Sequence, residues 1–404
     1  MAHRKPWARP RRRRLSSAPA FALAAALAIA APTAACTSAG SGTSATAGAA
    51  GTGAAGTGAG TGAAGTTSPA ITAAQARQVF DRYVATAAKA VSPRLASPLL
   101  SLVTGVEQAV LTATRASHGV AMNGSPSNAQ GAYSSSLSVQ PDVAVYTYGA
   151  PTFYLPAAAG YPRFFVASVN RALRGTDSPA TGAGGAQVPP DGPALMLFEQ
   201  AGARAPWLLA SISQLPSGVT LPKLATGSAG YVPTVPLSDA SLVAQPVDAG
   251  PLQAGVVDDG QASAATRAVA DGPLTTGMYQ GAVDHAGGLR APRGDVYQWE
   301  LDGSSLPRFA LRTAAGGALV FYAMSLNTTV AVPDVINKGN PVHSGPPIQV
   351  PADLQALLPV GQPAPLVQLQ SQQTLSFAAI DPAPGTAKIQ VIAMGGGLTS
   401  ATAS

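Results

Sequence analysis

The chain has 404 residues with a formal net charge of +6, and only one of its residues is cysteine. Seven of the 24 basic residues and none of the 18 acidic residues precede that cysteine, Cys36, so the remainder carries 17 basic and 18 acidic residues, a net charge near −1. A nucleic-acid-binding protein needs clustered positive charge on its folded part, and this remainder has none. A lone cysteine also excludes a disulfide within the chain and any Cys-X-X-Cys site.

Residues 1–35 have the pattern of a secretory signal peptide. A 13-residue apolar run, 19–31, follows a segment with seven basic residues, which are Arg4, Lys5, Arg9 and Arg11 to Arg14. A basic start, a short apolar run and small residues are typical of an export signal. A membrane-spanning helix needs about 20 apolar residues, so an uncleaved membrane helix is the less favoured alternative.

The apolar run ends in Thr33, Ala34, Ala35 and Cys36. This segment resembles the lipobox of bacterial lipoproteins, although the usual leucine three places before the cysteine is Thr33 here. The resemblance implies that Cys36 receives a diacylglycerol and that the chain is cut before it. Two acyl chains suffice for stable anchoring. An ordinary cut that leaves a free thiol is the alternative, and the "RRRRL" segment leaves Sec and twin-arginine export both open.

Residues 36–69 are predicted to be a flexible tether. After Cys36 this stretch holds only Gly, Ala, Ser, Thr and one Pro, which cannot bury enough apolar surface to fold. "GTGAAG" occurs at 51–56 and again at 60–65 and matches the dinucleotide-binding G-x-G-x-x-G pattern. That pattern requires a preceding strand and a following helix, and neither is predicted, so we expect no bound dinucleotide.

Two helices open the predicted folded head. Thr72 and Gln75 form a capping box for the first. Its apolar residues recur at helical spacing and are Ala76, Val79, Phe80, Tyr83, Val84 and Ala87. The second is predicted from Ser97 to Gly119, with Leu99, Leu102, Val103, Val106, Val110 and Ala113 as its buried stripe.

Short β-rich runs then dominate. They are "VAVYTYG", "RFFVASVN", "ALMLFEQ", "WLLASIS", "DVYQWEL", "RFALRTA", "ALVFYAMSLNTTVAV", "TLSFAAI" and "KIQVIAM". Residues 175–192 are predicted to be a loop, and 236–272 to hold weak helical stretches at "LSDASLVAQ" and "QASAATRAVA". Helices followed by strands predict an α+β fold with helices packed on curved antiparallel sheets.

The halves of the head resemble each other in sequence. "YPRFFVAS" (161–168) is similar to "LPRFALRT" (306–313), "ALMLF" (194–198) to "ALVFY" (318–322), and "LLASI" (208–212) to "SFAAI" (376–380). We therefore predict two tandem subdomains, 70–230 and 231–398, with a disordered tail at 399–404. Chance similarity of strand-like segments is the alternative, and the prediction requires Arg163 and Arg308 to lie on equivalent strands.

The element order of the first half resembles the cystatin-like fold of nuclear transport factor and ketosteroid isomerase. That resemblance implies helices packed on a curved sheet that encloses a pocket. No motif of those proteins is matched, so no catalytic residue is transferred.

Known catalytic and metal-binding motifs are absent from the sequence. There is no H-E-x-x-H, no G-x-S-x-G and no Gly-Lys pair. The histidines after Cys36, namely His118, His285 and His343, are widely separated. Asp258 and Asp259 are predicted to lie in a solvated turn, and Asp284 and His285 in a glycine-flanked loop where they more often face water than form a dyad.

Other candidates depend on where their side chains point. Glu199 and Glu300 lie in strand-like runs, and either would become a general acid if it faced a pocket, because desolvation raises the pKa of a carboxyl group. The alternative is a solvent-facing strand residue. Arg163 and Arg308 each lie between Pro and Phe and could bind an anion, or cover apolar surface with their stems. Asn327 in "NTT" matches a glycosylation acceptor, which a bacterial export signal makes irrelevant.

The sequence thus predicts an exported protein anchored to the outer face of the cytoplasmic membrane by a lipid on Cys36. Overall it resembles actinobacterial surface lipoproteins whose folded part is a domain of unassigned function. We expect the soluble head to bind an envelope ligand or protein, with no nucleic acid, no metal, no cofactor and no catalytic residue assigned. The alternatives are an assembly factor for the cell envelope without a ligand pocket, and an enzyme that uses a pocket carboxylate.

Overall fold

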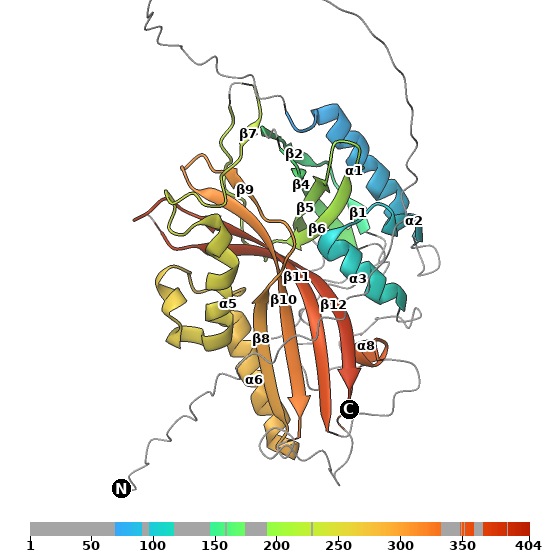
Figure 1. Cartoon of the computed structure of the whole chain (residues 1–404), viewed down its shortest axis with the longest axis vertical. Coiled ribbons are helices and arrows are strands. Elements are labelled where there is room, and N and C mark those ends of the chain that lie inside the picture. Colours follow the sequence, from blue (N-terminus) through green and yellow to red (C-terminus); the bar gives the residue numbers. More distant parts are fainter. Residues whose placement is uncertain are drawn as a thin grey trace, which may run out of the picture. The chain divides into compact units, whose positions relative to one another are not determined.

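A computed structural model describes residues 69–90, 97–116, 146–157, 160–173, 192–227, 229–332, 348, 350, 352–358, 367–385 and 387–404. Its helices are α1 (Ala73–Ala87), α2 (Ser97–Leu100), α3 (Gly105–Ala116), α5 (Ala249–Asp259), α6 (Thr276–Arg293) and α8 (Ala352–Gln355). Its strands are β1 (Tyr146–Tyr148), β2 (Thr152–Tyr154), β3 (Pro156–Ala157), β4 (Arg163–Leu173), β5 (Gly192–Gln200), β6 (Leu208–Gln214), β7 (Val232–Pro233), β8 (Val296–Gly303), β9 (Phe309–Arg312), β10 (Ala318–Ala331), β11 (Gln368–Asp381) and β12 (Gln390–Ala403). The α+β prediction is confirmed (Figure 1).

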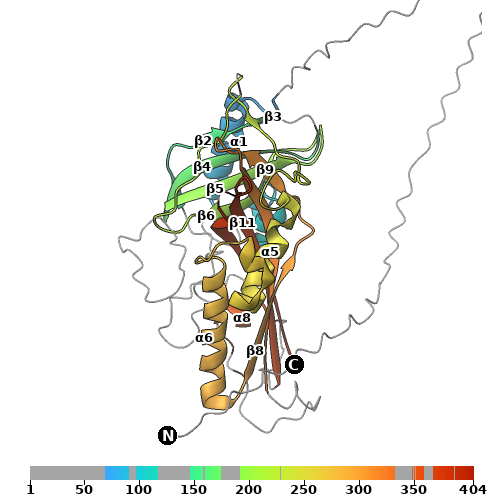
Figure 2. The same ribbon diagram turned by 90° about the vertical axis from the view of Figure 1, so that its left-hand side faces the viewer.

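Ten of the described strands form one antiparallel sheet in the order β1-β4-β5-β6-β12-β11-β10-β8, with β2 beside β4 and β9 beside β10. We call β1, β2 and β4–β6 the N-terminal half-sheet, and β8–β12 the C-terminal half-sheet. The two meet where β6 pairs with β12 through Gln214 and Met394. The strands of one half-sheet cross those of the other at a steep angle (Figure 2).

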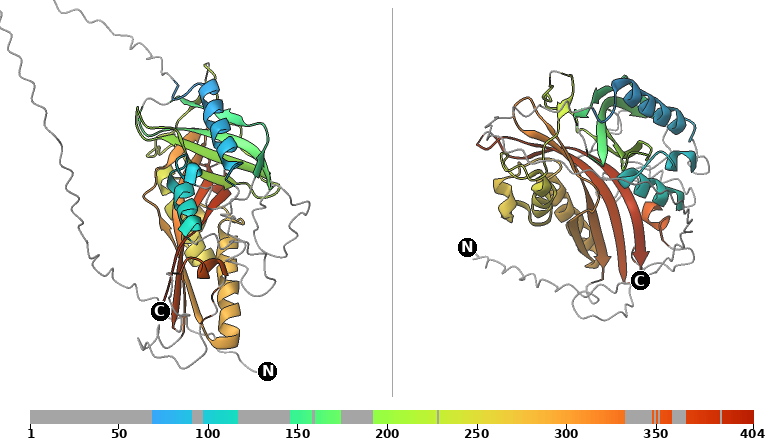
Figure 3. Two further views of the ribbon diagram at one scale, coloured as in Figure 1. Left: turned by 90° about the vertical axis from the view of Figure 1, so that its right-hand side faces the viewer. Right: turned by 45° about the horizontal axis from the view of Figure 1, so that its top comes forward.

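Three apolar clusters hold these layers together. Helices α1 and α2 and the segment before α3 pack on one face of the N-terminal half-sheet, and α5 and α6 pack on one face of the C-terminal half-sheet. The remaining faces pack on each other, and the rings of Phe164 and Phe309 stack there with centroids 4.4 Å apart. The layer order is therefore helices, sheet, sheet, helices (Figure 3).

The first predicted helix is confirmed, including its capping box. The Thr72 side chain accepts from the Gln75 backbone, and the Gln75 side chain accepts from the Thr72 backbone N–H. Ala76, Phe80 and Tyr83 are buried, as the helical spacing predicts. This cap fixes the start of α1 and thereby the position of Tyr83, about three turns further on.

The second predicted helix is wrong in one respect, because two helices, α2 and α3, replace it. Val103 forms a parallel bridge with Leu209, and Thr104 N–H donates to the Leu209 carbonyl. Gly105 then takes a φ of 56°, and a side chain there would approach the Ala210 carbonyl oxygen to 3.1 Å. The bridge therefore interrupts the helix while leaving its predicted apolar stripe buried.

Three further expectations are corrected. Residues 399–404 are not a tail, since β12 pairs with β11 as far as Ala403 and Leu369. "LSDASLVAQ" is not helical, and "QASAATRAVA" forms only short 3-10 turns. Helices α5 and α6, which the sequence did not predict, cover the C-terminal half-sheet instead.

The predicted correspondence of Arg163 with Arg308 is also wrong. Arg163 begins β4, whereas Arg308 directly precedes β9, a short strand paired with β10 as β2 is paired with β4. The other two predicted pairs of segments are displaced in the same way, by one strand. The order of strands nevertheless recurs: β1, β2, β4, β5 and β6 take the same places as β8, β9, β10, β11 and β12.

Candidate functional site

A buried group of polar side chains lies between the first helices and the N-terminal half-sheet, in a layer that is otherwise apolar. We call it the polar cluster. Its members come from five elements, α1, α3, β1, β4 and β6, and are Tyr83, Glu107, Tyr148, Arg171 and Gln214. Electrostatic interactions couple Glu107, Arg171 and the two tyrosines, so they belong to one region.

Strand alternation places Arg171 in this layer. Phe165, Ala167 and Val169 face the helices as part of the apolar cluster, and Arg171 continues the same alternation along β4. Across the sheet Arg171 is paired with Tyr148 on one side and with Gly192 on the other. The cluster therefore lies at the end of the half-sheet where β4 ends and β5 begins.

Arg171 is 5% exposed. Its Nε donates to Gln214 Oε1 at 2.7 Å, and its guanidinium lies 4.4 Å from the centroid of the Tyr146 ring. The ion pairs within the described residues are Arg77–Asp81 and Arg312–Asp239, so Arg171 has no carboxylate partner among them. A buried cation without a directly paired anion is costly, which makes this position unusual.

Gln214 is 1% exposed, and its amide nitrogen has no acceptor among the described atoms. A buried donor left unsatisfied costs about 1–3 kcal/mol. Gly192 is paired with Arg171 across the sheet, and a Cβ added there would have Gln214 Nε2, at 3.8 Å, as its only neighbour within 4 Å. There is thus space beside the unsatisfied amide that a side chain at 192 would take.

Glu107 is half-buried on α3, and its Oε1 accepts a hydrogen bond from the Ile212 backbone N–H at 3.0 Å. Burial raises the pKa of Glu107 to about 7, although Arg171 and the Ile212 hydrogen bond act to lower it. Near neutral pH this carboxyl group is therefore present in both its protonated and its ionised form.

Tyr83 and Tyr148 contribute neutral hydroxyl groups. Their rings meet edge to face with centroids 6.5 Å apart. Burial raises the pKa of Tyr83, and it raises that of Tyr148 to about 12. Both phenols are therefore protonated at physiological pH, and the polar cluster combines one fixed cation, one titratable acid and several neutral hydrogen-bonding groups.

The two glutamates that the sequence favoured lie elsewhere. Glu199 is half-buried on β5 opposite Phe164, on the face where the half-sheets pack, and burial raises its pKa. No described basic group is ion-paired with it. Glu300 is exposed on β8 opposite Asn327, so it is the solvent-facing strand residue named as the alternative.

Both predictions for the aspartate pairs are corrected. Asp258 and Asp259 lie at the end of α5 rather than in a turn, and Asp258 accepts from the Leu301 backbone N–H at 3.0 Å. Burial raises the pKa of Asp258 to about 6. This contact holds α5 against β8, so the role of Asp258 is structural.

Asp284 and His285 lie within α6, not in a loop. Asp284 Oδ1 accepts from Gln280 Nε2 one turn earlier, whereas the His285 ring packs edge-on against Tyr297 with centroids 4.6 Å apart. Successive residues of a helix point in different directions, so these two do not form a dyad.

Arg163 and Arg308 are half-buried, and the Nε of each is buried with no acceptor among the described atoms. The Arg163 guanidinium lies 4.6 Å from the centroid of the Tyr161 ring. Because the two arginines occupy different topological places, they do not form a matched pair of anion sites. Asn327 lies within β10 and donates to Asp302 at 2.9 Å.

Cys36, His118, His343 and both "GTGAAG" segments lie outside the described residues. Within the described ranges, no group of three or more His, Cys, Asp or Glu side chains is placed to hold a metal ion. No helix of the described part combines the length and apolarity that a membrane span requires.

Sequence reasoning missed the polar cluster, although two signals point to it. Arg171 is in phase with three apolar residues of β4, which indicates a buried arginine. Glu107 is one of only three glutamates after Cys36, and it lies among the apolar residues of the second predicted helix. The pairing of Arg171 with Gln214, 43 residues further along the chain, has no signal in the sequence.

The fold and the polar cluster define an α+β protein whose helix-covered antiparallel sheet encloses a cation and an acid. Residues 67–403 match the family described as "Domain of unknown function (DUF8094)", and the chain belongs to this family. No curated protein and no solved structure shows significant similarity to it.

Proposed function

We propose that this chain is an exported, lipid-anchored surface protein whose head binds a small ligand at the polar cluster. The observation that carries the binding function is the buried Arg171–Gln214 pair, which has no carboxylate partner among the described residues and whose glutamine amide nitrogen is unsatisfied. Unsatisfied buried polar groups are rare in folded proteins, and a ligand that supplies the missing partners explains them.

The anchoring rests on the signal-like residues 1–35 and the lipobox-like segment that ends at Cys36. The resemblance to actinobacterial surface lipoproteins supports an envelope location. In this proposal residues 36–69 hold the head away from the outer face of the cytoplasmic membrane.

We further propose two tandem cystatin-like subdomains on the basis of strand order alone, because the sequence correspondence that required Arg163 and Arg308 on equivalent strands is wrong. The recurring strand order supports this proposal. In the N-terminal half-sheet β4 has β1 and β2 on one side and β5 on the other, and in the C-terminal half-sheet β10 has β8 and β9 on one side and β11 on the other. The polar cluster then belongs to the first subdomain, between its helices and its sheet.

The anchoring is tested by intact mass spectrometry of the protein extracted from membranes. We expect a chain that begins at Cys36 and carries a diacylglycerol, and a Cys36→Ser variant that is no longer found in the membrane fraction. A mature chain that begins elsewhere, or a free thiol at position 36, contradicts the anchoring.

Ligand binding is tested by thermal shift of the full chain, purified in detergent, against envelope glycans, lipids and small metabolites. We expect at least one compound to raise the melting temperature of the wild type and not that of an Arg171→Met variant. Arg163→Met is the matched control, because it removes an arginine of the same strand outside the polar cluster. A shift that survives in Arg171→Met places the ligand elsewhere.

A second candidate function, proton transfer by an enzyme, is favoured by the raised pKa of Glu107. A carboxyl group that titrates near neutral pH beside hydrogen-bonding hydroxyls is suited to general acid–base catalysis. Chemical conversion of a bound compound, abolished in Glu107→Gln while binding persists, would establish this function instead.

A further inference from the structure

The charges of the polar cluster indicate what kind of ligand it takes. Arg171 is a permanent cation, and the described residues give it one hydrogen-bond acceptor, Gln214 Oε1, and no carboxylate within 4.0 Å. Tyr83 and Tyr148 are neutral. A neutral ligand would leave Arg171 with only the through-space effect of Glu107, whereas an anionic ligand would pair with it directly.

The donors also favour a planar anion. A guanidinium presents several N–H groups in a fixed planar fork, and carboxylate oxygens match that fork. Gln214 Nε2 adds a neutral donor next to it, and no described atom accepts from it. The side chain missing at Gly192, opposite Arg171, leaves space beside that amide.

We propose that the ligand carries a carboxylate that pairs with Arg171 and accepts a hydrogen bond from Gln214 Nε2, and that binding of the ligand protonates Glu107. This inference rests on the proposed function. The covalent structure of the ligand does not change. Where Glu107 is ionised before binding, one proton moves from solvent to its carboxylate as the ligand enters.

Proton uptake follows from the balance of charge in the cluster. Without ligand, the ionised Glu107 acts through space on Arg171. A bound carboxylate takes over that pairing and adds a second negative charge to the same enclosed region. Like charges in a poorly solvated site disfavour each other's ionisation, so the group that binds a proton readily, Glu107, becomes neutral.

The other elements packed on α3 do not compete for this role. The strands β6 and β12 contain no titratable side chain. Asp381 at the end of β11 accepts a hydrogen bond from Ala244, and Tyr322 of β10 donates to Gln253 in the other core cluster. The remaining groups near Glu107 are Arg171 and the tyrosines Tyr83 and Tyr148 of the polar cluster.

Acetate, compared with its neutral analogue acetamide, is the probe for this inference. Binding to the full chain in detergent is measured by NMR line broadening of each probe at constant chloride, at pH 6 and at pH 8. We expect acetate to bind and acetamide not to bind. Since Glu107 titrates at about 7, linkage predicts about tenfold weaker acetate binding at pH 8 than at pH 6.

Variants separate the residues. Glu107→Gln keeps an acceptor for the Ile212 N–H and is neutral, so acetate affinity is expected to become independent of pH and to equal the wild-type value at pH 6. Glu199→Gln, a half-buried glutamate outside the cluster, is expected to retain the tenfold pH dependence. Arg171→Met and, if that variant does not fold, Gln214→Met are expected to weaken acetate binding at least several-fold.

The outcomes distinguish the inference from the proposed function. No binding of acetate, or unchanged pH dependence in Glu107→Gln, overturns the inference. If acetamide and acetate bind equally, and both lose binding in Arg171→Met, the inference of an anionic ligand is wrong, but the polar cluster is still a ligand site. Acetate binding that survives in both Arg171→Met and Gln214→Met contradicts both.

Discussion

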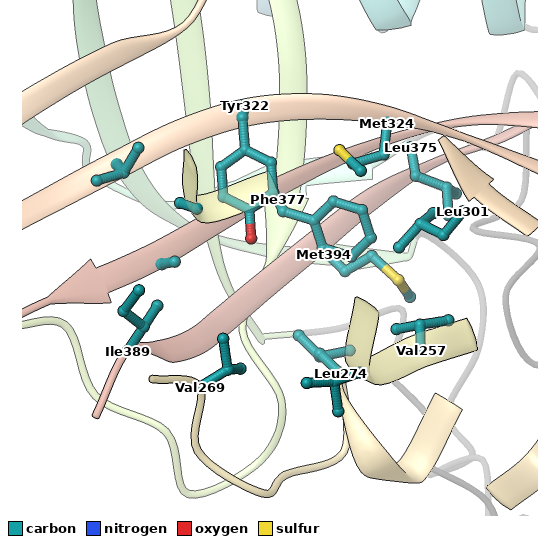
Figure 4. Close-up of a cluster of buried hydrophobic side chains, with 14 of the residues drawn as sticks. Val257, Val269, Leu274, Leu301, Tyr322, Met324, Leu375, Phe377, Ile389 and Met394 are labelled. Carbon is teal, nitrogen blue, oxygen red and sulfur yellow. The ribbon is translucent and has the colours of Figure 1, made fainter. Parts of the chain in front are cut away.

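Gln253 and Tyr322 place a polar pair inside the apolar cluster between α5, α6 and the C-terminal half-sheet. The Tyr322 hydroxyl donates to Gln253 Oε1 at 2.8 Å, and Gln253 Nε2 donates to the Leu274 carbonyl at 2.8 Å. Tyr322 points into this cluster among Phe377, Met324 and Met394 (Figure 4). The Tyr322 hydroxyl and both polar side-chain atoms of Gln253 therefore have hydrogen-bond partners, in contrast to the unsatisfied amide nitrogen of Gln214.

Tyr322→Phe is expected to destabilise the protein by about 1–3 kcal/mol, because it leaves the buried Gln253 oxygen without a donor. The measurement is the free energy of unfolding in urea. Tyr161→Phe is the control, since Tyr161 is 42% exposed. An equal effect of both substitutions would show that the Tyr322 hydrogen bond makes no specific contribution.

The residue scale also shows where sequence reasoning stops. The apolar stripe of α1 and the alternation of β4 are periodic, so buried residues such as Phe80 and Phe165 follow from the sequence. Arg171 extends that alternation, whereas the strand-like run predicted from the sequence, "RFFVASVN", stops at Asn170. The partners Glu107 and Gln214 come from other elements, and only the tertiary fold brings them to Arg171.

At the scale of elements, the glycines of β12 allow the two half-sheets to meet. A Cβ on Gly395 would overlap the Ile212 carbonyl oxygen of β6, and Gly396 has a φ of 106°. Ser213 and Ser376 also share a hydrogen bond of 2.9 Å across this junction. A strand with larger residues here could not lie against both β6 and β11.

Gly395→Ala is therefore expected to destabilise the protein by at least about 1–3 kcal/mol, the usual cost of overpacking. Gly288→Ala is the matched control, because a Cβ there meets nothing within 4 Å and alanine favours the helix α6. Comparison of melting temperatures tests this prediction. A Gly395→Ala protein as stable as Gly288→Ala would contradict the close approach of the two strands.

Removal of Thr399–Ser404 provides a second test at this scale. These residues form the final pairs between β12 and β11, and Ala401 is buried in a small apolar cluster with Leu369 and Leu398. We expect the shortened chain to have a lower melting temperature than the full chain. An unchanged melting temperature would restore the original expectation of a disordered tail.

Helix α6 and the end of β12, which were not predicted from the sequence, are both rich in residues that disfavour regular secondary structure. Helix α6 contains five glycines or prolines in "TGMYQGAVDHAGGLRAPR", and the final residues of β12 are small and polar like the predicted tether. Intrinsic propensity disfavours both assignments. Packing of α6 on the C-terminal half-sheet and pairing of β12 with β11 outweigh these local preferences. Both contacts join residues far apart in the sequence, so a local stretch of sequence does not indicate them.

At the scale of the whole molecule, several buried acids make stability depend on pH. Burial raises the pKa of Glu107 to about 7 and those of Asp258 and Asp381 to about 6. The folded protein therefore binds more protons than the unfolded chain at mildly acidic pH, and these groups lower the free energy of unfolding as the pH rises. His285 opposes them, because burial lowers its pKa.

Glu107→Gln is expected to reduce this loss of stability between pH 5 and pH 8, by at most about 3 kcal/mol. Urea unfolding of both proteins at the two pH values measures the difference. Glu300→Gln, on an exposed residue of β8, is the control and should keep the part of the loss that is due to Glu107, because the Glu300 charge acts on the pKa of Asp258. A larger loss in Glu107→Gln than in the wild type would reverse the assigned direction of the shift.

The strand furthest along the chain, β12, lies in the middle of the sheet between β6 and β11. A chain cut before Gln390 would therefore leave two open edges at once, one on each half-sheet, and both would present unpaired backbone N–H and C=O groups. Such edges are templates for intermolecular strand pairing. Proteolytic cleavage just ahead of β12, followed by loss of the strand, would expose both edges and promote aggregation.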